Sequence, residues 1–210
     1  MEFMDFFNML ARWGHLLFGM TWIGLLYYFN FIQGGYFKSA TPEGLADGKA
    51  KLAPAALWWF RWGAMFTFIT GLILLESVHK MNVMNEYIII GSVMGTLMFL
   101  NVWLIIWPNQ KIALGMVEGD APSAGAKALL ASRTNTLFSA PMAFCMLAGP
   151  HFSGYGMGTG SMAMWTALGI VAVLEINALM GKQGPMTTVR GVIVSSLALT
   201  AIIIGILVFM

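Results

Sequence analysis

The stretch RWGHLLFGMTWIGLLYYF, residues 12–29, decides the fold class. Its middle is apolar enough to lie in lipid, although it carries the imidazole of His15 and, one turn earlier, the guanidinium of Arg12. The whole chain has this character, because 59% of its residues are hydrophobic and 10% are charged, whereas a soluble domain has about 25% charged residues. We therefore predict an integral membrane protein in a lipid bilayer. The net charge of +2 is too small to suggest a nucleic-acid partner.

A helix that crosses a bilayer needs about 20 mainly apolar residues, and the sequence contains several segments of that kind. We predict an all-α membrane helix bundle of about six transmembrane helices, forming one domain over residues 1–210. The expected spans are residues 5–33, 54–80, 85–107, 132–150, 161–180 and 187–210. The two long connections, 34–53 and 108–131, are expected to be too short for a separate domain. The acidic start lacks the basic region of a signal peptide, so we expect the first helix to be retained.

Lysine and arginine positions predict the orientation of these spans, because cytoplasmic loops carry an excess of both residues. If the N-terminus lies outside, only Arg12 and Lys80 of the 11 basic residues fall on the outer side. Six spans then return the C-terminus to the outside. The expected location is the cytoplasmic (inner) membrane of a bacterium, with several passes.

This topology places the three histidines in or beside the outer leaflet. His15 lies in the first span, and Gly19 follows on the same helical face, where it would leave a slot for a flat macrocycle. His79 ends the second span and His151 follows the fourth. Ionisable groups inside a membrane are costly and usually face the bundle interior. We therefore expect His15, His151 and His79 to be candidate ligands of a metal, most simply the iron of a b-type haem.

Haem propionates are anionic, so they would need cations near water, and Arg12 and Lys80 are the cations on the predicted outer side.

The three histidines and Arg12 also have a simpler interpretation, which involves no haem. His15 would then be a packing histidine hydrogen-bonded to a neighbouring helix, with the nearby glycines allowing close approach. His79 and His151 would be solvated residues at helix ends, and Arg12 would extend to the lipid headgroups.

Four stretches together resemble one family, the N-terminal membrane domain of bacterial membrane-bound urate oxidases (urate hydroxylases). They are residues 12–29, WWFRWGAMFTFITGLILL at 58–75, NVWLIIWPNQK at 101–111 and ASRTNTLFSAPMAFCMLAGPHF at 131–152. His15 and His151 lie inside these blocks. In that family the membrane domain precedes a cytochrome c domain outside the cytoplasmic membrane, whereas this sequence contains no CxxCH motif.

The resemblance implies a membrane redox module that passes electrons to an outer acceptor, with urate-oxidase-like activity as the corresponding expectation. The partner would be a separate cytochrome c or a larger membrane complex, and small-residue helix faces also suit a homo-oligomer. The alternative is a cofactor-free accessory subunit packed in a larger respiratory or oxidase complex.

Overall fold

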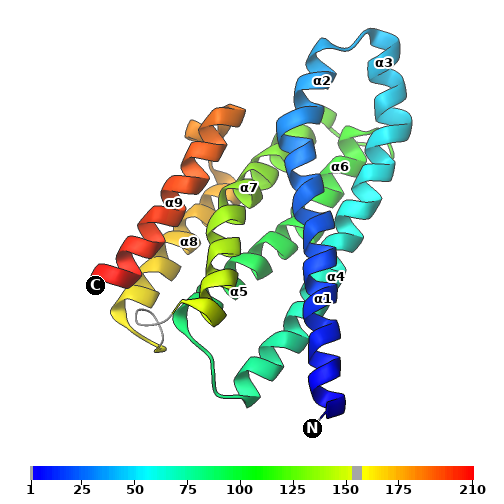
Figure 1. Cartoon of the computed structure of the whole chain (residues 1–210). Helices are drawn as coiled ribbons and strands as arrows, with labels where there is room; N and C mark the ends of the chain where they lie inside the picture. Colours follow the sequence, from blue (N-terminus) through cyan, green and yellow to red (C-terminus); the bar gives the residue numbers. More distant parts are fainter. Residues whose placement is uncertain (1, 153–157) are drawn as a thin grey trace. The chain divides into compact units, whose positions relative to one another are not determined.

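The computed structural model describes residues 2–152 and 158–210, and within that part the regular structure is helical throughout (Figure 1). The predicted all-α class is confirmed. Two compact units make up the fold. The first unit comprises residues 1–74 and 99–132, and the second comprises residues 75–98 and 133–210.

The described residues form a series of α-helices. In chain order they are α1 (Glu2–Tyr27), α2 (Gly34–Ser39), α3 (Pro42–Asp47), α4 (Ala53–Lys80), α5 (Glu86–Leu100), α6 (Trp107–Ala113), α7 (Ala121–His151), α8 (Met162–Met180) and α9 (Val189–Phe209). Wider π-helical turns join several of them without a break, at Tyr28–Gln33, Gly48–Leu52 and Asn101–Ile106.

Five helical segments are long and apolar enough to cross a membrane. They are Asp5–Ser39, Pro42–Lys80, Glu86–Ala113, Met162–Met180 and Val189–Phe209. The sixth expected span, residues 132–150, is present as the main part of α7, but α7 is not among these five. The inside–outside orientation stays a prediction. The chain is a multi-pass membrane protein by helix length and hydropathy.

The long connection over residues 34–53 is largely helical. Thr41 explains how α3 begins there, because its side-chain oxygen accepts the Gly44 N–H at 3.2 Å and Pro42 occupies the first helical turn. A Thr cap followed by proline is a strong helix start. Residues 28–52 therefore form a helical hairpin that extends α1 and α4 beyond the expected spans.

Glycines set the closest approach between α1 and α4. A Cβ on Gly63 would lie 3.2 Å from the backbone nitrogen of Trp22, so a larger residue there would push the helices apart. In the second unit, a Cβ on Gly91 of α5 would lie 3.1 Å from the Cβ of Cys145 on α7. These are the small-residue contacts by which membrane helices pack.

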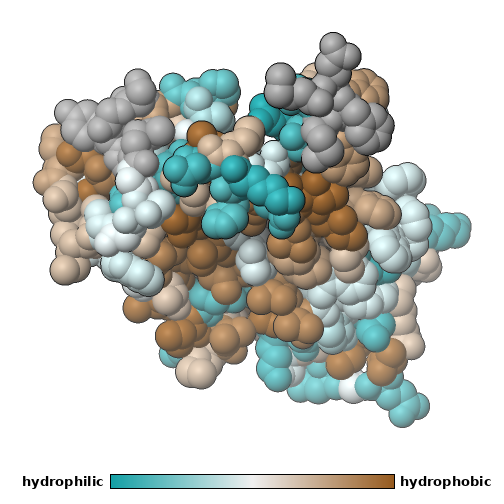
Figure 2. All heavy atoms as spheres, turned by 90° about the horizontal axis from the view of Figure 1, so that it is seen from below, coloured by the Kyte–Doolittle hydropathy of each residue, from teal (hydrophilic) through white to brown (hydrophobic). Residues whose placement is uncertain are grey.

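Large apolar side chains are exposed on the outer surfaces of the helices, as lipid contact requires. Examples are Leu104, Val173 and Leu197, each at least 60% exposed. Figure 2 shows hydrophobic patches beside hydrophilic ones on the face seen from below. An aqueous protein seldom exposes this much apolar surface.

Candidate functional site

His15 lies on α1 with its ring against α4, in the first unit. Its Nδ1 is 2.9 Å from the carbonyl oxygen of Thr67 and 3.2 Å from the hydroxyl of Thr70. A carbonyl oxygen can only accept, so the contact with Thr67 assigns a proton to Nδ1. In the neutral ring, Nε2 then keeps its lone pair.

Glycines on both helices make room for this imidazole. A Cβ on Gly71 would lie 3.1 Å from the Cε1 atom of His15, so Gly71 allows the ring to rest on α4. Gly19 also faces α4, because a Cβ there would lie 3.9 Å from the Thr67 methyl group. The geometry therefore provides the close packing that the simpler interpretation of His15 requires. The role of Gly19 beside a cofactor stays a prediction.

His79 and His151 lie at the same end of the second unit. The chain turns after His79 and reaches Asn85, whose side-chain nitrogen donates to the Gly149 carbonyl at 2.9 Å, two residues before His151. Both histidines are exposed. Since His15 belongs to the other unit, a haem or metal shared with it stays a prediction.

The expected outer cations are both at the surface. Arg12 is exposed, and Lys80 pairs with Glu76 at 2.8 Å. Across residues 2–152 and 158–210, no group of three or more His, Cys, Asp or Glu side chains is placed to hold a metal ion. A haem needs one or two axial donors rather than such a group.

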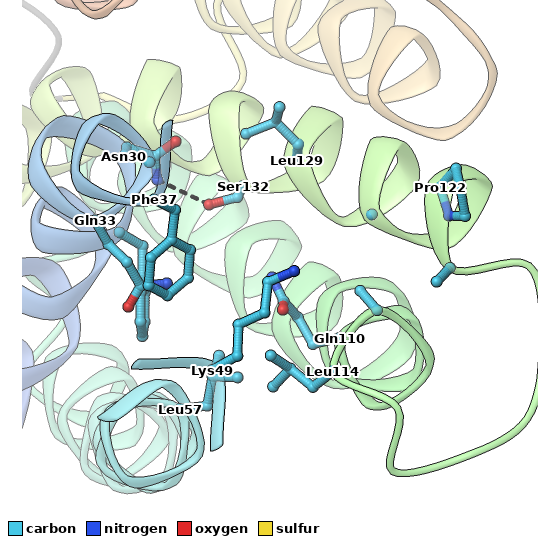
Figure 3. Close-up of a pocket in the computed structure, with 15 residues that line it drawn as sticks. Asn30, Gln33, Phe37, Lys49, Leu57, Gln110, Leu114, Pro122, Leu129 and Ser132 are labelled. Carbon is cyan, nitrogen blue, oxygen red and sulfur yellow. Dashed lines mark hydrogen bonds between the residues drawn. The ribbon is translucent and has the colours of Figure 1, made fainter. Parts of the chain in front are cut away.

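A cavity of about 490 Å³ lies near the other end of α1, within the first unit (Figure 3). Its polar lining consists of Asn30, Gln33, Lys49, Gln110 and Ser132, and its apolar lining includes phenylalanine, leucine and alanine side chains. Asn30 donates to the Ser132 hydroxyl at 2.8 Å and to the Leu26 carbonyl at 2.9 Å. The size falls within the range of small-molecule sites.

The cavity was not predicted from sequence, because its lining comes from four separated segments. Asn30 and Gln33 lie in one π-helical turn and Lys49 in another, while Gln110 lies on α6 and Ser132 on α7. Such π turns are rare and frequently occur at functional sites. The available sequence signal for the cavity was the pair of amide residues, Asn30 and Gln33, at the end of the apolar run of the first expected span.

The second feature missed is the polar stretch of α7 at the start of the fourth expected span. Five consecutive residues are buried there, namely Ser132, Arg133, Thr134, Asn135 and Thr136. Asn135 donates to the Met98 carbonyl of α5 at 2.9 Å. Arg133 is 8% exposed, and its Nε and one terminal nitrogen have no hydrogen-bond partner. The run SRTNT was visible in the sequence, inside the stretch at 131–152.

Comparison with known proteins gives one finding. A family model described as urate oxidase N-terminal matches residues 79–208, more than half of the 210-residue chain. The match contains the stretches at 101–111 and 131–152, whereas those at 12–29 and 58–75 lie before it. No curated protein and no solved structure matches the chain.

Proposed function

Because the chain belongs to the urate oxidase N-terminal family, we propose that it is a membrane redox protein that binds b-type haem through His15. It passes electrons to an acceptor on the outer side of the bacterial cytoplasmic membrane. The family description suggests that a urate-oxidase-like reaction supplies the electrons. A separate cytochrome c or a larger membrane complex is the proposed acceptor.

One observation carries this proposal, the hydrogen bond between His15 Nδ1 and the Thr67 carbonyl. Histidines that bind metals usually donate their other ring N–H to a carbonyl or carboxylate, which fixes the tautomer and the ring orientation. His15 has that arrangement, with Nε2 left as the donor atom for iron.

The other predicted residues have defined places in the proposal. His151 and His79 would be candidate ligands within the second unit, and Arg12 would neutralise a propionate near the membrane surface. Bound haem supplies one-electron chemistry, with a potential set largely by its axial ligands. The chain itself orients His15 through Thr67 and keeps the ring against α4 through Gly71.

A cofactor-free accessory subunit is the second candidate function. The close packing of α1 and α4 favours it, because the bond between His15 and Thr67 also serves as a tie between helices. Exposed apolar side chains on the helices, such as Trp165 at 61%, would also suit packing against other membrane subunits. The two candidates differ in what Nε2 does.

The test is a reduced-minus-oxidised visible spectrum of the detergent-purified protein, with a pyridine haemochrome assay for stoichiometry. His15→Asn is the informative variant, because the amide nitrogen of asparagine can replace Nδ1 as the donor to Thr67 while nothing replaces Nε2. His15→Ala removes both atoms. Lys127→Gln, an exposed change on α7, is the control for purification and handling.

The proposal predicts a b-type α band in the unchanged protein and in the Lys127→Gln protein. It also predicts loss of that band in His15→Asn at nearly unchanged thermal stability. No haem or iron in the unchanged protein would refute the proposal. Normal stability of His15→Asn with reduced stability of His15→Ala would then support the accessory-subunit alternative.

A further inference from the structure

The cavity of Figure 3 is accompanied by tryptophans that mark a membrane surface. Its lining residue Leu57 comes directly before Trp58 and Trp59, which are 48% and 60% exposed. Gln110, also in the lining, lies one helical turn after Trp107. Tryptophan side chains are enriched where a bilayer meets water. The cavity therefore lies at the depth of lipid headgroups, within the first unit.

The charge of the lining favours an anionic headgroup. The described residues that line the cavity include Lys49 and neither aspartate nor glutamate. Lys49 is exposed and forms no ion pair with another described residue, whereas its neighbour Lys51 pairs with Asp47. Figure 3 shows the Lys49 side chain extending toward Gln110. A lysine at the membrane surface attracts anionic lipids, and its exposure suits contact with a phosphate that stays beside water.

Two buried amide oxygens indicate what else the headgroup carries. Asn30 and Gln33 line the cavity, and the Asn30 Oδ1 and Gln33 Oε1 atoms are buried without a hydrogen-bond donor. The Asn30 amide is held by its nitrogen, which donates to the Leu26 carbonyl and the Ser132 hydroxyl. Gln33 is more adaptable, because its longer side chain has more rotamers through which to reach a ligand. These acceptors favour a headgroup with O–H or N–H donors, which choline lacks.

We propose that this cavity binds the phosphoglycerol headgroup of an anionic phospholipid. Lys49 would contact the phosphate, and a headgroup hydroxyl would donate to the Gln33 amide oxygen. Phe37 and Leu129, also in the lining, would contact the glycerol backbone and the first carbons of the acyl chains, which remain in the bilayer. An ethanolamine headgroup also has donors, but it is zwitterionic and would leave the charge of Lys49 unbalanced.

The experiment is native mass spectrometry of the full chain in detergent micelles, titrated with four lipids that share the same acyl chains. Phosphatidylglycerol is anionic and has headgroup hydroxyls, whereas phosphatidylmethanol has the same charge without them. Phosphatidylethanolamine has donors without net charge, and phosphatidylcholine has neither. The dissociation constant of the first bound lipid is measured for each. Excess glycerol 3-phosphate then tests whether a soluble phosphate competes for the site.

Four variants assign the contacts. Lys49→Gln removes the proposed charge and Lys49→Arg restores it. Lys127→Gln removes an equal exposed charge from α7 outside the lining. Gln33→Leu removes the adaptable amide oxygen. Circular dichroism of each variant checks that its helical structure is unchanged.

Phosphatidylglycerol is expected to bind about fivefold more tightly than phosphatidylmethanol, as one hydrogen bond provides, and the two neutral lipids should bind more weakly still. Lys49→Gln should weaken phosphatidylglycerol binding about fivefold, while Lys49→Arg and Lys127→Gln should leave it unchanged. Gln33→Leu should abolish the preference for phosphatidylglycerol over phosphatidylmethanol.

Equal binding of the four lipids would overturn the proposal, as would equal effects of Lys49→Gln and Lys127→Gln. An unchanged lipid preference in Gln33→Leu would overturn the assignment to a glycerol headgroup. Displacement of the lipid by glycerol 3-phosphate would assign the cavity to a soluble phosphate and also overturn it. His15→Asn should leave lipid binding unchanged, so this test is independent of the haem proposal.

Discussion

Asn85 should be a stability determinant of the second unit, because its one side chain makes two different bonds. Its oxygen accepts the Ile88 N–H at 3.1 Å, capping α5, and its nitrogen donates to the Gly149 carbonyl of α7 at 2.9 Å. Asn85 is 2% exposed, so water cannot replace either bond without a rearrangement.

The expected cost of Asn85→Ala follows from those two bonds. Loss of a helix N-cap costs about 1 kcal/mol, and a buried acceptor left unpaired costs about 1–3 kcal/mol. Asn85→Ala should therefore lower the free energy of unfolding by about 2–4 kcal/mol. Asn85→Ser keeps a capping oxygen and loses the bond to Gly149. Its free energy of unfolding should therefore lie between those of Asn85→Ala and the unchanged chain. Thr188→Ala removes an exposed cap on Gly191 and should cost about 1 kcal/mol or less.

The assay is reversible unfolding of the detergent-solubilised protein by a denaturing detergent, followed by circular dichroism. Equal losses for Asn85→Ala and Thr188→Ala would refute the reasoning, because they would mean that the bond to Gly149 contributes nothing. An Asn85→Ser protein as stable as the unchanged chain would refute it in the same way.

Three further predictions concern packing. Gly91→Leu should lower the free energy of unfolding by about 2 kcal/mol, as overpacking does, because its Cβ would lie 3.1 Å from Cys145; Gly95→Leu, with open space around it, should cost much less in the same assay. Cys145 has 0% exposure, so a maleimide should label it only after unfolding, and rapid labelling of the folded protein would contradict its placement. The Arg61 guanidinium lies 3.3 Å from the centre of the Trp107 ring, so Trp107→Leu should lower the unfolding free energy by about 1–2 kcal/mol, whereas an unchanged thermal midpoint would argue against this contact.

The sequence was sufficient to predict the helical membrane class and the family. Long apolar runs leave few alternatives in lipid, because helices satisfy their own backbone groups. The family match over 79–208 agrees with the resemblance seen at 101–111 and 131–152. The stretches at 12–29 and 58–75 lie before the matched residues, so the proposed role of His15 is argued from its bond to Thr67.

Helix extents and the cavity were harder to predict because they depend on local turns and on packing between distant segments. Hydropathy placed the end of the first span at residue 33, but the helical path continues to Ser39. The hydropathy pattern also gave no sign that Lys49 would lie near Gln110. For His15, the sequence suggested either a metal ligand or a packing residue. The hydrogen bond to the Thr67 carbonyl is compatible with both roles.

The buried polar run of α7 has a consequence for how the chain enters the membrane. Arg133 lies at the start of the expected span 132–150 and is accompanied by Asn135 and two threonines, and charged and polar side chains reduce the gain from entering lipid. Such a segment gains little by leaving the translocon alone. We expect it to be retained there until α8 and α9 emerge, since Ser196 of α9 donates to the Leu137 carbonyl of α7 at 2.8 Å. Membrane integration of α7 would then be completed by α8 and α9, which are synthesised after it.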